Sequence, residues 1–227
     1  MGYAALFSGG KDSSLALWKA QSLGLSVDYL VTVYPRKIDS YMFHKPNLHL
    51  VPKLAESLDI ELVKIRTIGE KEKELEDLED GLRKLKINGV ITGAVASNYQ
   101  MQRIENISRK LSLDVFAPTW KMNQSELLED LLKNGFRSII VSVSAYGFDE
   151  EWLGRTIDEK CVQDLKNLQE KYGINISGEG GEYETLVLEA PNYNQNFKTS
   201  EKEKNWDGKR GELVIKKLEK KDVRRNK

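Results

Sequence analysis

The sequence has very little cysteine, no net charge and no long apolar run. Its 227 residues include one cysteine, Cys161, so no disulfide can form within the chain. Lysine plus arginine equals aspartate plus glutamate, 35 of each, and this balance leaves no overall field to attract nucleic acid. No stretch predicts a signal peptide or a membrane-spanning helix. These absences predict a cytoplasmic protein with no membrane partner and argue against a nucleic-acid partner.

The order of apolar patterns predicts two domains. In the first half, strands are expected at 3–7, 27–34, 60–65, 89–93 and 115–118, with helical stretches between them. This alternation predicts an α/β domain built on an open parallel sheet, with helices on both faces. The pattern changes after Trp120, and two helices with short strands at 138–143, 186–189 and 211–218 predict a smaller mixed α/β domain. The expected domains are therefore 1–120 and 121–227, with a basic tail from Lys216 that frays.

The most informative stretch lies between the first strand and the first helix. A strand, a glycine turn and a helix start aim backbone N–H groups and the positive end of a helix dipole at one spot, which favours an anion. The residues expected around it are Ser8, Gly9, Gly10, Lys11, Asp12, Ser13 and Ser14. Lys11 adds a positive charge, and Asp12 either caps the helix or holds a magnesium ion. The competing interpretation is an ordinary capped turn, where Gly, Ser and Asp are common.

This pattern is not the Walker loop, whose glycines are spaced more widely before Lys-Ser/Thr. It resembles the PP-loop, SGGxDS, of the N-type ATP pyrophosphatases. The resemblance implies an adenine nucleotide α-hydrolase-like fold, a loop that grips the β,γ-pyrophosphate, and ATP cut between its α and β phosphates. Ligands of parallel sheets sit at the carboxyl ends of the strands, so Tyr34 and Gly93 are expected to contact the same nucleotide.

A loop at 35–46 follows the second strand and is long for a compact domain. Loops of this kind are often lids, so it is expected to close over ATP. It contains His44, which by itself is more simply interpreted as a surface histidine. Cys161 lies in the apolar-periodic stretch 158–172, which predicts a packed thiol rather than a nucleophile.

Four further stretches match one family. They are Phe43-His44-Lys45-Pro46-Asn47, Tyr99-Gln100-Met101-Gln102-Arg103-Ile104-Glu105, Trp152-Leu153-Gly154-Arg155 and Gly178-Glu179-Gly180-Gly181-Glu182-Tyr183-Glu184-Thr185. Together with the PP-loop, they resemble the diphthine–ammonia ligase family from residue 3 to about residue 191. The segment 178–185 is the most specific of them.

The resemblance implies an ATP-dependent amide-forming ligase. Its substrate is diphthine, a modified histidine of translation elongation factor 2, its other reactants are ammonium and ATP, and Mg2+ is the metal cofactor. The products are diphthamide, AMP and pyrophosphate, formed through an acyl-adenylate. The implied catalytic residues are Lys11, Asp12, Glu182 and Glu184. The implied substrate-binding residues are His44, Asn47, Tyr99, Arg103, Gly180, Gly181 and Tyr183.

Two of these stretches also have simpler interpretations. Tyr99 and Arg103 share a helix face, where Arg103 would neutralise a phosphate or the diphthine carboxylate, or simply pair with Glu105 or Glu126 on the surface. The glycines of 178–185 let a partner chain approach, and Glu182 or Glu184 would hold ammonium or accept its proton. The simpler interpretation of that segment is a glycine turn leading into a strand, and 152–155 is most simply a turn that joins domains.

Two other functions stay open on the sequence alone. A PP-loop enzyme that modifies tRNA would need a basic face, and only the tail near Arg224 and Arg225 offers one. A regulator that binds ATP without turnover would not need the complete 8–13 loop. The sequence leaves the oligomeric state open, a homodimer included.

Overall fold

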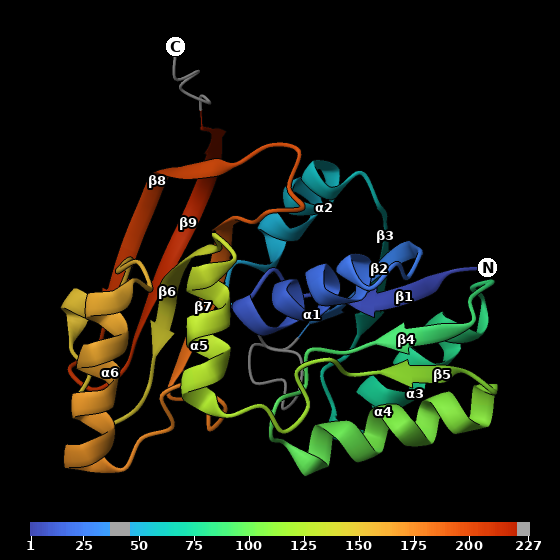
Figure 1. Ribbon diagram of the computed structural model, residues 1–227, viewed down its shortest axis with the longest axis horizontal. Coiled ribbons are helices and arrows are strands. Elements are labelled where there is room, and N and C mark those ends of the chain that lie inside the picture. The colour runs from blue at the N-terminus through green and yellow to red at the C-terminus, as the bar shows by residue number, and fades with distance from the viewer. Residues whose placement is uncertain (37–45, 222–227) are drawn as a thin grey trace. The chain divides into compact units, whose positions relative to one another are not determined.

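A computed structural model describes residues 1–36 and 46–221 of the chain. The chain divides into two compact units, Met1–Met122 and Asn123–Lys227. Each unit has a sheet of its own, as Figure 1 shows. None of the helices in the described ranges has the length and hydrophobicity to span a lipid bilayer.

The first unit is built on a parallel sheet in the order β3-β2-β1-β4-β5. Its strands are β1 (Tyr3–Leu6), β2 (Val27–Pro35), β3 (Glu61–Thr67), β4 (Gly89–Ile91) and β5 (Asp114–Phe116). Its helices are α1 (Lys11–Ser22), the short 3-10 turn η1 (Leu48–Leu50) with α2 (Val51–Leu58), α3 (Lys71–Arg83) and α4 (Asn98–Leu111).

This strand order separates the helices into two layers. The chain steps from β1 outward to β3, returns to β4, and then steps outward on the other side to β5. Because crossovers between parallel strands are right-handed, α1 and α2 lie on one face, and α3 and α4 on the other. The core beneath α3 and α4 is a cluster of apolar side chains that includes Leu78, Leu82, Ile104, Ile107, Ala4, Val31, Val33, Ile65 and Val90. The order reverses between β1 and β4, so the carboxyl ends of these strands mark the place where a ligand is expected.

The second unit has an antiparallel sheet in the order β7-β6-β9-β8, together with two helices. Its elements are α5 (Gln124–Lys133), β6 (Arg137–Val143), the 3-10 turn η2 (Glu150–Trp152), α6 (Glu159–Tyr172), β7 (Tyr183–Glu189), β8 (Phe197–Trp206) and β9 (Gly211–Lys220). The predicted α/β class, a parallel-sheet domain followed by a mixed unit, is confirmed.

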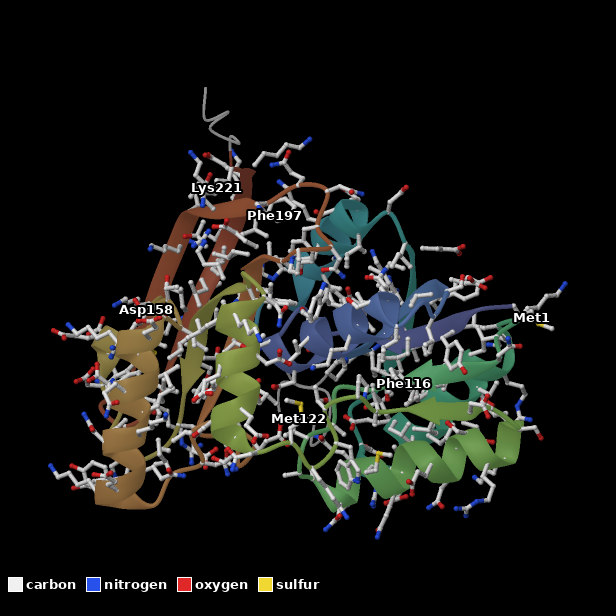
Figure 2. The ribbon with its side chains drawn as sticks, in the orientation of Figure 1. Met1, Phe116, Met122, Asp158, Phe197 and Lys221 are labelled. Atoms are coloured by element: carbon white, nitrogen blue, oxygen red, sulfur yellow. The ribbon has the colours of Figure 1, made fainter. Side chains whose placement is uncertain are left out.

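The end of the chain differs from the prediction in two ways. Strand β8 was not predicted, and β9 runs to Lys220, so the expectation that the chain frays from Lys216 is wrong for residues 216–220. Cross-strand ion pairs and main-chain hydrogen bonds explain why this end of the chain is ordered. Lys216 Nζ lies 3.0 Å from Glu203 Oε2, and the Lys221 N–H donates to Asn196 O at 2.8 Å. Figure 2 shows Phe197 and Lys221 at the same end of the β8–β9 pair.

Candidate active site

The turn from β1 to α1 forms a cradle of backbone around residues 8–13. Gly9 has φ 76°, a conformation that a glycine adopts without strain. Gly10 is the N-cap of α1 in an extended conformation, and it supplies no side-chain cap. The first turn of the helix therefore directs its N–H groups and its positive dipole end into the loop, as the sequence predicts.

Serine hydroxyls tie the two ends of this loop together. The Ser8 N–H donates to Ser13 Oγ at 3.3 Å, and the two hydroxyl oxygens lie 3.2 Å apart. The Ser13 hydroxyl lies 3.1 Å from the Gly10 carbonyl oxygen, to which it donates. Behind the loop, the buried Thr32 hydroxyl donates to the carbonyl of Phe7, the residue that leads into it. These hydrogen bonds hold the loop in shape.

Lys11 and Asp12 form an ion pair inside the cradle. The Lys11 ammonium lies 2.9 and 2.8 Å from the two carboxylate oxygens of Asp12. The Lys11 side chain is 3% exposed and that of Asp12 is 28% exposed. A buried ammonium beside an N-terminal helix turn suits a phosphate, and the more accessible carboxylate suits a cation.

Asp12 is also the residue that fits a magnesium ion. Mg2+ in nucleotide sites is usually held by one or two carboxylates together with phosphate oxygens and water. Within residues 1–36 and 46–221, no group of three or more His, Cys, Asp or Glu side chains could hold a metal ion. The single carboxylate of Asp12 fits a metal that is held in part by nucleotide oxygens.

Gly93 follows β4 and packs directly against the start of α1. A Cβ at this position would lie 2.7 Å from the carbonyl carbon of Asp12 and 2.7 Å from the nitrogen of Ser13. Both are backbone atoms, which cannot move aside as a flexible side chain can. The structure therefore brings Gly93 to the loop, where it sets the distance between β4 and the cradle.

Tyr34 and Asn47 lie at the same edge of the sheet. The Tyr34 hydroxyl donates to the carbonyl of Leu48 at 3.3 Å, and burial raises the pKa of Tyr34 to about 12. Asn47 is buried and adopts a left-handed conformation with φ 65°. His44 and most of the expected lid at 35–46 lie outside the described residues.

Tyr99 and Arg103 form one rigid unit at the start of α4. The Arg103 guanidinium carbon lies 3.3 Å from the centroid of the Tyr99 ring, a cation–π contact. Arg103 Nη2 also lies 3.4 Å from a carboxylate oxygen of Glu72, which comes from α3. Arg103 thus pairs with Glu72, because α3 and α4 pack side by side. Glu105, two residues further along α4, lies on another face of that helix. Ser97 caps this helix by accepting the Gln100 N–H at 3.3 Å, and its Ser-x-x-Gln spacing was a signal that could have been used.

In the second unit, residues 178–182 form a tight turn, and residues 183–185 begin β7. Gly178 and Gly181 have φ 75° and 83°, as the predicted glycine turn requires. The buried Tyr183 hydroxyl donates to the Ile176 carbonyl at 2.7 Å. The Glu182 carboxylate accepts the N–H groups of Asn175 and Gly180 at 2.9 and 2.8 Å. Glu184 lies half-buried on β7, opposite Ser142.

Three residues that support this turn gave no signal in the sequence. Ser144 follows β6, and its hydroxyl donates to the Gly181 carbonyl. Gln124 begins α5, and its side-chain oxygen accepts the Ile176 N–H at 2.9 Å. The Asn175 side chain accepts from the N–H and hydroxyl of Ser177. They are distant in sequence or chemically ordinary, so only the fold identifies them.

The contacts of Arg155 and Cys161 are those of residues that support the fold. Arg155 stacks on Trp152 with its guanidinium carbon 4.5 Å from the ring, and it forms an ion pair with Asp164. Its carbonyl accepts the Ile140 N–H at 2.9 Å, so the 152–155 turn is bound to β6. Cys161 is fully buried, and burial raises the pKa of its thiol to about 11. A thiol of this kind packs rather than reacts.

Two family models cover almost the whole chain. The diphthamide synthase N-terminal domain matches residues 1–115, and the diphthamide synthase C-terminal domain matches residues 123–221. The chain belongs to the diphthamide synthase family. The predicted resemblance to diphthine–ammonia ligases is confirmed by relatives of that name. The protein of Bos taurus is 34% identical over 215 residues, which cover 84% of this chain and 80% of the relative.

Other members of the family are similarly related. The diphthine–ammonia ligase of Homo sapiens is 32% identical over 214 residues, with 84% of this chain and 80% of that protein covered. One solved structure, described as a predicted subunit of tRNA methyltransferase from Methanocaldococcus jannaschii, is 17% identical, with a TM-score of 0.44 and coverage of 84% and 97%. A likeness of that degree does not bear on function.

Proposed function

We propose that this protein is a diphthine–ammonia ligase, which amidates the carboxylate of diphthine on translation elongation factor 2. The observation that carries the proposal is the match of both units to the diphthamide synthase family, together with a PP-loop cradle that holds Lys11 and Asp12. The proposed substrate is a translation factor, which puts the reaction in the cytoplasm. ATP and Mg2+ are the proposed cofactors.

The first half of the reaction, the adenylation of diphthine, is proposed for the cradle. The diphthine carboxylate attacks the α-phosphorus of ATP, and pyrophosphate leaves. Lys11 and the N–H groups of the α1 start stabilise the charge that builds on the departing β,γ-phosphates. Asp12 would hold the magnesium ion, which neutralises phosphate charge when bound. Ser8, Gly9, Gly10 and Ser13 form the cradle, and Ser14 follows them in α1. Tyr34 and Gly93 lie at the ends of β2 and β4, the two strands that flank β1.

Recognition of diphthine is proposed for the start of α4. Arg103 is held by the Tyr99 ring and by Glu72, so little side-chain freedom is left to lose when it binds an anion. Its planar guanidinium suits a carboxylate or the α-phosphate. His44 and Asn47 are proposed to bind substrate on the grounds of the family motif.

The second half of the reaction is proposed for residues 178–185. Ammonia attacks the carbonyl carbon of the acyl-adenylate, a C–N bond forms, and AMP leaves with the electron pair of the broken C–O bond. A proton must leave the nitrogen, and a carboxylate of this segment accepts it. We assign this role to Glu184, since the carboxylate of Glu182 accepts the backbone N–H groups that shape the turn. Gly180, Gly181 and Tyr183 would form the surface that the substrate loop meets.

One incubation tests the proposal. The pure protein is mixed with ATP, Mg2+, ammonium and elongation factor 2 that carries diphthine. The expected result is AMP formation together with the mass change that converts a carboxylate to an amide on the factor. The matched control is a factor that lacks diphthine, which should give no amide. AMP formation that does not depend on diphthine, or an unchanged factor, would contradict the proposed function.

A further inference from the structure

The Glu182 carboxylate points back into its own turn. One oxygen accepts the Asn175 N–H at 2.9 Å and the other accepts the Gly180 N–H at 2.8 Å. These donors lie on either side of Gly178 in the sequence. One side chain therefore closes the turn from within, and hydrogen bonds to a charged acceptor are stronger than neutral ones.

The backbone around the carboxylate is shaped to admit it. A Cβ at Gly180 would lie 2.7 Å from a Glu182 carboxylate oxygen, so a side chain there would displace the carboxylate. Gly181 differs, because a Cβ there would meet nothing within 4 Å, and only its φ of 83° calls for glycine. The two glycines thus have separate functions: Gly180 makes room for Glu182, and Gly181 is exposed toward open space.

The main chain of Glu182 anchors the same turn to β6. Its carbonyl accepts the Ser144 N–H at 2.9 Å, and the Ser144 hydroxyl donates to the Gly181 carbonyl. The side chain and the main chain of Glu182 therefore act together. The first fixes the curvature of the turn, and the second fixes its position at the end of the sheet.

We infer that Glu182 is a positioning residue, which holds the 178–181 turn in the conformation that meets the substrate loop, and that it does not exchange a proton with ammonia. The inference rests on the proposed function and refines one of its residues. Both Glu182 oxygens accept N–H groups from the backbone of their own turn. A proton taken up by the carboxylate would remove its charge and weaken these hydrogen bonds, which would loosen the turn.

A graded set of variants tests this inference. Glu182→Gln keeps one acceptor oxygen, Glu182→Ala keeps none, and Glu184→Gln is the matched control on the neighbouring carboxylate. The measurements are amide hydrogen exchange at Asn175 and Gly180, the KM for diphthine-bearing factor, kcat against pH, and ATP affinity by calorimetry.

For a positioning residue, exchange at both amides rises from wild type to Gln to Ala. The KM for the factor rises in the same order, by roughly 10-fold or more for Glu182→Ala. ATP affinity and the shape of the pH profile stay as in wild type. Glu184→Gln leaves the exchange at both amides unchanged.

Three results would overturn the inference. The first is unchanged amide exchange in Glu182→Ala. The second is a loss confined to kcat, with the acidic limb of the pH profile removed. The third is lower thermal stability with an unchanged KM, which would make Glu182 merely structural. Wild-type protein that forms no amide would instead refute the proposed function, and the exchange measurement would still decide whether Glu182 shapes the turn.

Discussion

Gly93 and Asp12 touch through their backbones: a Cβ on residue 93 would lie 2.7 Å from the Asp12 carbonyl carbon. Gly93 follows β4, and Asp12 lies in the first turn of α1, which follows β1. The contact therefore lies at the carboxyl ends of β1 and β4, the two strands between which the order of the sheet reverses. A side chain at 93 would move the phosphate cradle as a whole.

The variant Gly93→Ala should therefore bind ATP less tightly and lose ~10- to 100-fold in kcat/KM, because a shift of about 1 Å in a reacting group is enough for such a loss. The measurements are ATP calorimetry and AMP formation. Gly81→Ala is the matched control, since its Cβ would meet the Ile65 side chain in the core, away from the cradle. That control should cost stability and leave kcat/KM near wild type. Equal kcat/KM in wild type and Gly93→Ala would contradict the prediction.

Lys11→Ala should lose ~100-fold or more in the rate of AMP formation, because it removes a charge that stabilises the transition state. Lys19→Ala, in the last turn of the same helix, is the control and should keep its rate. Circular dichroism would verify that both variants are folded. A folded Lys11→Ala protein with a normal rate would mean that the cradle does not act as a PP-loop.

The Lys11–Asp12 ion pair predicts that nucleotide and metal bind cooperatively. Phosphate should draw Lys11 away from Asp12, which then becomes free to hold Mg2+. Coupling of this kind is reciprocal, so Mg2+ should raise ATP affinity, and ATP should raise Mg2+ affinity by the same factor. Calorimetry with and without EDTA would measure it. Asp12→Asn should reduce the gain in ATP affinity that Mg2+ produces by ~10-fold. An equal gain in wild type and variant would exclude Asp12 as the metal ligand.

Cys161 predicts how stability depends on alkaline pH. The pKa of its thiol is raised to about 11, mainly by burial and also by the carboxylates of Asp158 and Asp164, against a lowering by the Arg155 guanidinium. In the unfolded chain the thiol pKa is about 8.5. The folded state thus holds this proton more tightly. Its contribution is fully present below about pH 8.5 and is lost as pH rises toward 11, up to about 3 kcal/mol.

Urea unfolding at pH 8 and pH 10.5 would measure this contribution. Cys161→Ala should be less stable than wild type at pH 8, because it leaves a cavity, but should lose less between the two pH values. Iodoacetamide should label the wild-type thiol slowly at pH 8 and rapidly once urea unfolds the chain. Equal losses of stability in wild type and variant would contradict the assignment.

The PP-loop and the glycine-rich segment could be predicted because each is continuous in sequence. Neighbouring residues determine the local backbone geometry, so the turns at Gly9 and Gly181 and the start of α1 could be predicted from the sequence. The contact of Gly93 with Asp12 could not, because it depends on how closely β4 approaches α1. The bonding of Glu182 was missed for a related reason: a glutamate in a glycine turn gives no sign of which way it points.

The missed strand has a different cause. Residues 197–206 are exposed at almost every position, so they lack the alternation of apolar and polar residues that predicts a strand. They are ordered by pairing with β9, whose Leu213, Ile215 and Leu218 are buried. The fraying expected from Lys216 failed for the same reason, because the charged end of β9 is ordered by its pairing with β8.

Strand β8 ends the second sheet, and a free sheet edge is a template for aggregation. Glutamates at 201 and 203 share one face, and lysines at 202 and 204 share the other, because side chains alternate along a strand. If two copies joined antiparallel at this edge, residues on the same face would meet. Glutamate would then oppose glutamate and lysine would oppose lysine, which is destabilising. The charges that hid this strand from prediction thus oppose the pairing of two copies through the β8 edge.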